Sequence, residues 1–75
     1  MQSSLADLSI GKRAVIKGFT NTEISLKLIE LGCIPGSEVT MLRHAPFGDP
    51  VAFACSGSII SIRLLEAATV LLETA

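Results

Sequence analysis

The stretch EVTMLRHAPFGDPVAFACSGSIISI, residues 38–62, decides the expected fold, because apolar residues alternate along three short segments between turn residues. Successive side chains of a strand point to opposite faces, so a period of two indicates strands that bury one face. We therefore expect strands at 38–42, 51–55 and 59–63, with a tight hairpin turn at Ser56 and Gly57. The inward positions are Val39 and Met41, then Val51, Phe53 and Cys55, and finally Ile60 and Ile62.

The segments on either side of this stretch add two further strands. Residues 12–19 predict a strand with Ala14 and Ile16 on its inner face, and residues 69–73 predict a last one through their alternating apolar pattern. Residues 64–68 leave room for only about one helical turn before it. The chain is thus expected to be mainly β, with about five strands.

One α-helix is expected between the first two strands. Thr20, followed three positions later by Glu23, is typical of a capping box that satisfies the first free amides of a helix. Gly32 should end the helix, because glycine takes positive φ without steric cost. Pro35 and Gly36 suit the central positions of a type II turn. The chain therefore reverses directly into the next strand.

Short strands placed closely around one helix favour a small closed or nearly closed barrel, since closure removes exposed edges. At 75 residues the chain has room for one domain, residues 1–75, with one modest core. Cys33 and Cys55 are the only cysteines and have no metal-binding spacing. We expect both to be buried as small hydrophobic side chains.

Charge and hydropathy narrow the class of function. The net charge is −1, and the six lysines and arginines are spread singly, so no clustered positive potential is predicted for nucleic acid. No stretch approaches the ~20 apolar residues of a membrane span, and the first residues lack the features of a signal peptide. We expect a cytoplasmic, soluble protein with no direct membrane insertion.

Residues that could carry chemistry are few and scattered. The single histidine, His44, has no evident nucleophile beside it, the acidic residues form no recognisable pair, and no glycine-rich loop precedes a helix. Asp49 is expected to stabilise its own turn by bonding nearby backbone amides, and His44 to be solvated. The sequence therefore predicts no enzyme and no catalytic, cofactor or metal site.

Three motifs, LGCIPGSEV (31–39), APFGDPVAF (45–53) and ISIRLLEA (60–67), are similar in order and spacing to the FeoA family, the small cytosolic component of bacterial ferrous iron uptake. The resemblance covers nearly the whole chain from LADLSIGKRAVI (5–16) onward. It implies an SH3-like barrel with an inserted helix. It also implies an accessory role toward the FeoB membrane permease, acting on its cytosolic GTP-binding portion or on its assembly.

Two other functions stay open on the sequence. The same barrel resembles the C-terminal domain of iron-dependent repressors, so fold alone allows a module that senses or binds ferrous iron. A small-barrel nucleic-acid binder is the third class, although the charge pattern disfavours it.

The expected helix carries more apolar residues than one face can bury. At about 100° per residue, Ile24, Leu28 and Leu31 share the face that should close the barrel. Leu26 and Ile29 project away from it. The resemblance to the FeoA family implies basic residues at about positions 25–27, and this helix is more apolar there. They are scattered surface groups, or they meet the N-terminal Leu5, or they are exposed anchors for the permease or for a second copy of the chain.

Phe47 is the third candidate partner contact. It stands at the tip of the expected loop, where a large apolar group has no evident core to enter. It either folds back over the barrel or forms an exposed contact.

Overall fold

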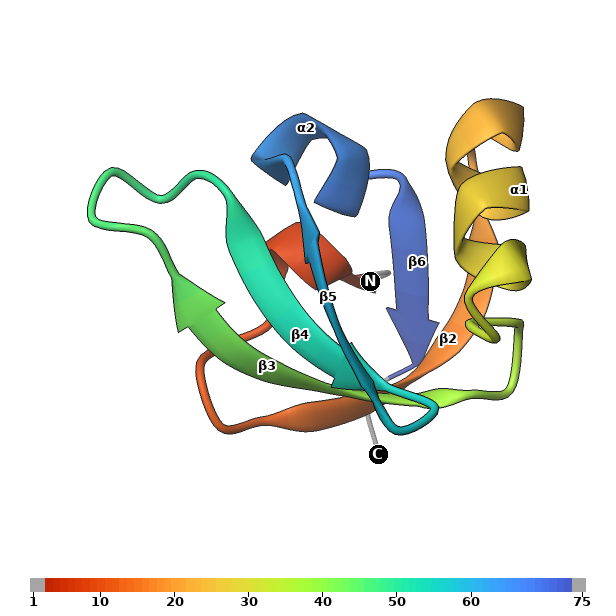
Figure 1. The fold of residues 1–75 in the computed structure, drawn as a ribbon, viewed down its shortest axis with the longest axis horizontal. Helices are drawn as coiled ribbons and strands as arrows, with labels where there is room; N and C mark the ends of the chain where they lie inside the picture. Colours follow the sequence, from red (N-terminus) through yellow and green to blue (C-terminus); the bar gives the residue numbers. More distant parts are fainter. Residues whose placement is uncertain (1–2, 74–75) are drawn as a thin grey trace.

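Six antiparallel strands form one curved sheet in the computed structural model, which describes residues 3–73 (Figure 1). The strands are β1 (Ser3–Ser4), β2 (Arg13–Phe19), β3 (Glu38–His44), β4 (Val51–Cys55), β5 (Ser58–Ile62) and β6 (Val70–Glu73). The helical elements are the 3-10 turn η1 (Leu5–Asp7), helix α1 (Thr22–Glu30) and the short helix α2 (Leu64–Ala67). The strand order is β1-β6-β2-β3-β4-β5, so β1 and β5 stand at the two ends of the sheet. The mainly β prediction is confirmed.

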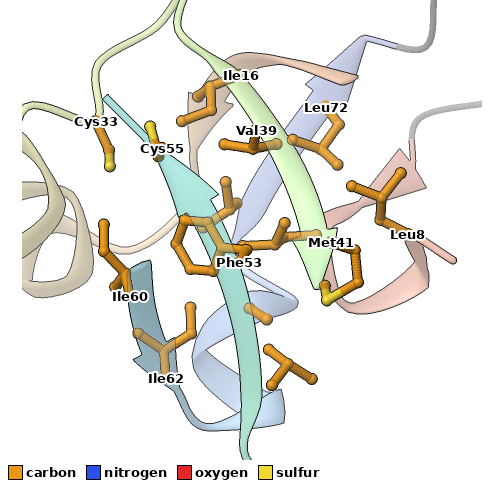
Figure 2. Close-up of a cluster of buried hydrophobic side chains, with 14 of the residues drawn as sticks. Leu8, Ile16, Cys33, Val39, Met41, Phe53, Cys55, Ile60, Ile62 and Leu72 are labelled. Atoms are coloured by element: carbon orange, nitrogen blue, oxygen red, sulfur yellow. The ribbon is translucent and has the colours of Figure 1, made fainter. Parts of the chain in front are cut away.

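The alternating residues of the sequence become the core. Phe53 on β4 is fully buried at the centre, and the side chains of Val39, Met41, Ile60 and Ile62 from the neighbouring strands surround it (Figure 2). Every inward position predicted from the period of two is buried. Burying one such side chain fully contributes about 1.5–3 kcal/mol, so this layer supplies most of the stability of a small barrel.

The N-terminal edge of the sheet was not predicted. Ser3 and Ser4 pair with Leu72 and Leu71 of β6, and the chain then turns through η1, where the Asp7 carboxylate accepts a hydrogen bond from the Ser4 amide at 3.3 Å. Two residues are too few to show a period of two. Only the pairing with β6 makes β1 a strand.

Helix α1 begins one residue later than the capping-box pattern predicts. Asn21 is the N-cap, and its side-chain oxygen accepts a hydrogen bond from the Ile24 amide at 3.0 Å. Thr20 is held elsewhere, because its amide donates to the carbonyl of Thr69 at 2.9 Å. Asparagine caps at least as well as threonine, so the tertiary contact of Thr20 moves the cap without cost.

Candidate functional site

Helix α1 is fixed to the barrel by one side only. Leu28 is fully buried and Ile24 is half-buried against the core, as the helical periodicity predicts. Leu26 and Ile29 are 59% and 45% exposed, so the predicted outward direction of these two side chains is confirmed. The Leu5 side chain is fully buried in the core and leaves Leu26 and Ile29 exposed.

The prediction that Leu31 joins the core face is wrong, because Leu31 is 46% exposed. The helix ends in a Schellman motif, in which the Cys33 amide donates to the Leu28 carbonyl at 2.9 Å and the Gly32 amide to the Ile29 carbonyl at 3.0 Å. This cap turns the chain inward, and Cys33 takes the buried position that an uninterrupted helix would give to Leu31.

The exposed apolar surface on α1 is therefore larger than the sequence indicated. We call Leu26, Ile29, Leu31 and Ile34 the α1 surface; all four are large apolar residues exposed to solvent. Ile34 follows the cap in the turn that Pro35 continues. The glycine stop at Gly32 was predicted, but its consequence was not: a Schellman cap changes which of the neighbouring residues can face the core.

Phe47 lies at the tip of the loop between β3 and β4 and is 99% exposed. A β-turn forms this tip: the Gly48 amide donates to the Ala45 carbonyl at 2.6 Å, with Pro46 and Phe47 at the central positions. The Ala45 amide donates to the Pro50 carbonyl at 3.0 Å and closes the loop base. Phe47 is thus held away from the core.

The structure does not bring the three candidate residues together. The loop that carries Phe47 and helix α1 lie at opposite ends of the longest axis of the molecule, which spans 28 Å (Figure 1). Leu26, Ile29, Leu31 and Ile34 are exposed on α1 or directly after it, and Phe47 is exposed at the far end of the molecule.

Asp49 does not stabilise its own turn as predicted. Its Oδ1 accepts a hydrogen bond from the Leu64 amide at 2.9 Å and so caps the first turn of α2. The Glu66 carboxylate accepts a second hydrogen bond from the Arg63 amide at 2.9 Å at the same helix start. The carboxylate of the loop is therefore a structural group that ties the β3–β4 loop to α2.

The prediction that His44 is solvated is wrong, because this last residue of β3 is half-buried. Its Nε2 lies 3.3 Å from the Leu8 carbonyl, in the segment that follows η1. Within residues 3–73, no three histidine, cysteine, aspartate or glutamate side chains come together as a possible metal site. A metal ligand role for His44 or Asp49 has no geometric support among these residues.

Cys33 and Cys55 are buried free thiols, as predicted, and lie side by side at one end of the core (Figure 2). Burial raises the pKa of the Cys33 thiol to about 12, with the neighbouring Cys55 as the second cause. Such a thiol stays protonated near neutral pH and is a poor nucleophile and a poor metal ligand. The pair therefore belongs to the core.

The part of the chain that the structure describes contains no helix of sufficient length and apolar character to cross a bilayer.

A family model for the FeoA domain matches residues 3–74. The chain belongs to the FeoA family. FeoA proteins are small accessory proteins of iron transport.

Solved FeoA structures have the same fold. FeoA from Chlorobium tepidum is 29% identical with a TM-score of 0.90, over 96% of this chain and 70% of that one. Zinc-complexed FeoA from Stenotrophomonas maltophilia, described as an SH3 domain protein and a candidate activating factor of ferrous iron transport, is 28% identical with a TM-score of 0.81, over 95% and 89% of the chains. The predicted SH3-like fold with FeoA membership is thus confirmed.

The likeness to metal-dependent repressors extends to the fold alone. A manganese-dependent transcriptional repressor superposes with a TM-score of 0.88 at 11% identity, over 99% of this chain and 37% of the repressor. Comparison with curated protein sequences found no match.

Proposed function

We propose that this FeoA protein binds the cytosolic, GTP-binding portion of a FeoB-type ferrous iron permease on the cytoplasmic side of the membrane and regulates iron uptake through that contact. Family membership supports the setting in ferrous iron transport. The observation that carries the proposal is the α1 surface: Leu26 and Ile29 are exposed on the helix, Leu31 and Ile34 are exposed directly after it, and Leu28 on the opposite side of the helix is buried in the barrel.

The α1 surface has the composition of a protein contact. Its apolar residues are bordered by the exposed charged side chains of Glu23, Lys27 and Glu30. Apolar anchors with a polar rim are typical of protein interfaces, because the rim excludes water while the anchors provide most of the binding energy. A rigid helix adds little ordering cost on binding. Leu26 and Ile29 are the proposed anchors, and Phe47 is a second, separate contact.

A binding assay with the purified cytosolic portion of the permease tests the proposal. The double variant Leu26→Glu/Ile29→Glu should keep its circular dichroism and melting temperature, because both side chains already face solvent, and should lose binding at least about 100-fold. Thr22→Glu is the matched control, since it adds a carboxylate to an exposed position of the same helix and should bind normally.

Phe47→Ala forms the second arm of the same assay. A weaker loss, up to about tenfold, would support Phe47 as an additional contact. Loss of binding in Phe47→Ala alone, with the α1 double variant binding normally, would overturn the assignment of the anchors to α1. Failure of the wild-type protein to bind the permease under any nucleotide state would overturn the proposed partner.

A further inference from the structure

Strand β5 leaves one edge of the sheet open. It stands at the end of the strand order and pairs with β4, with Val51 opposite Ile62 and Cys55 opposite Ser58. The other end of the sheet is β1, which pairs with β6. Within residues 3–73 the barrel is thus not closed by strand pairing between β1 and β5.

The hairpin turn fixes which backbone groups of β5 face outward. Ser56 and Gly57 both have positive φ, 51° and 77°, as a two-residue type I′ turn requires. The flanking pair Cys55 and Ser58 then exchanges both backbone hydrogen bonds, and alternate pairs along the ladder do the same. Ile60 and Ile62 therefore bond to β4.

The amides and carbonyls of Ile59 and Ser61 consequently point away from β4. No turn or loop hydrogen bond from the described residues reaches these groups. The side chain of Ile59 is 75% exposed, and Ser61 is exposed as well. The edge thus offers unpaired donors and acceptors, with an apolar side chain next to them.

Natural sheets usually block such an edge with a charged residue, a proline or a bulge. The segment SIISI of β5 contains no charged residue and no proline, and its pairing with β4 continues without a register shift. An uncharged edge with free backbone groups is a template for addition of another strand.

We propose that the occupant of this edge is a second copy of the chain, paired antiparallel through β5 about a two-fold axis at Ile60. In this register Ile59 pairs with Ser61 of the second copy and Ser61 with Ile59, so all four free backbone groups on each copy are used. A two-fold axis at Ile59 or at Ser61 would leave part of them unpaired. The symmetric dimer is the arrangement that satisfies the whole edge.

The same register avoids charge repulsion. Arg63, the first charged residue after β5, would lie opposite Gly57 of the second copy, and no acidic or basic residue of one copy faces a like charge in the strand pair. A five-residue edge buries less area than the roughly 1,600 Å² of a standard interface, so the dimer should be weak and form at high protein concentration. This contact uses neither the α1 surface nor Phe47, so it goes beyond permease binding and is tested separately from it.

Amide hydrogen exchange of the wild-type protein gives the most direct test. The amides of Ile59 and Ser61 should exchange rapidly in dilute protein and become protected as the concentration rises to about 1 mM, in step with dimer formation measured by sedimentation. Ile60 and Ile62 serve as internal controls, because their amides already bond to β4 and should not change. A protein that stays monomeric at this concentration, or a dimer with unprotected Ile59 and Ser61, would overturn the proposal.

Two double variants test the register. Ile59→Lys/Ser61→Lys places lysine opposite lysine twice and should weaken dimerisation at least about tenfold, since like charges directly opposite are unfavourable. Ile59→Glu/Ser61→Lys places glutamate opposite lysine twice at the same positions and should dimerise within about threefold of wild type. Both should melt as wild type does, because the positions are exposed. Equal association of the two variants would show that the strands do not pair in this register.

Discussion

Asp49 and Leu64 are 15 residues apart in the sequence, yet the Asp49 carboxylate accepts a hydrogen bond of 2.9 Å from the Leu64 amide. The contact joins the base of the Phe47 loop to the first turn of α2. A helix start has free amides, and a carboxylate acceptor satisfies one of them and interacts favourably with the helix dipole. The segment Gly48–Pro50 thus ties the loop to the fold, while the exposed Phe47 at the loop tip remains free for contact.

Removing this carboxylate should destabilise the protein without changing its partner contacts. We expect Asp49→Ala to lower the free energy of unfolding by about 1 kcal/mol, within the range of about 0.5–2 kcal/mol for lost helix caps. Asp49→Asn keeps an acceptor and should lose less. Urea unfolding at neutral pH measures both. Unchanged stability of Asp49→Ala would show that the Leu64 hydrogen bond contributes nothing.

Truncating Leu28 within α1 and Leu31 at its C-cap separates a core position from a surface position. Leu28→Ala should cost about 2–5 kcal/mol, because Leu28 is fully buried and the truncation leaves a cavity. Leu31→Ala should stay within about 0.5 kcal/mol of wild type, as is usual for an exposed side chain. Thermal melts followed by circular dichroism give the comparison. Equal losses would place Leu31 in the core after all.

Replacing Gly32, the glycine that ends α1, should destabilise the protein more than replacing Gly36. Gly32 has a φ of +90°, and a Cβ added there would lie 3.3 Å from the Cβ of Ser56. Gly36 has a φ of +96° with nothing within 4 Å of such a Cβ. Gly36→Ala should therefore cost about 1–2 kcal/mol from backbone strain alone, and Gly32→Ala more. Urea midpoints in the reverse order would contradict the close contact with Ser56.

The buried thiol of Cys33 predicts a loss of stability at alkaline pH. Its pKa is raised from 9.0 to about 12, so the unfolded chain releases this proton before the native state does. Between these pH values the native state binds more protons, and the free energy of unfolding falls as pH rises. Below about pH 9 the thiol is protonated in both states, so its contribution to the free energy of unfolding is fully present. Urea unfolding from pH 7 to pH 10 should show this slope.

Cys33→Ala is the control for that slope. It should be less stable than wild type at neutral pH through lost packing, but the gap between the two proteins should narrow above about pH 9 because the variant has no thiol to ionise. A constant gap would show that Cys33 titrates normally. A thiol reagent should also label native wild-type protein slowly and unfolded protein rapidly.

Local patterns predicted most of the barrel. The five longer strands, the hairpin at Ser56 and Gly57 and the burial of both cysteines all follow from interactions between residues close in sequence or from the period of two. The SH3-like fold itself was expected from motif resemblance to the FeoA family rather than from periodicity. The outward direction of Leu26 and Ile29 was also predictable, since one helix cannot bury two opposite faces on the same barrel.

The sequence by itself determined the strands, the turns and the apolar pattern, because each depends on preferences of neighbouring residues. Tertiary structure alone decided which acceptor meets which donor. The Asp49 carboxylate accepts from the Leu64 amide, and the Thr20 amide donates to the Thr69 carbonyl, so Asn21 rather than Thr20 caps α1. Pairing with β6 makes Ser3 and Ser4 a strand. These contacts join segments whose separation in sequence carries no local signal. They form only when the sheet curves and brings the segments together, and in that curved sheet the edge of β5 stays open.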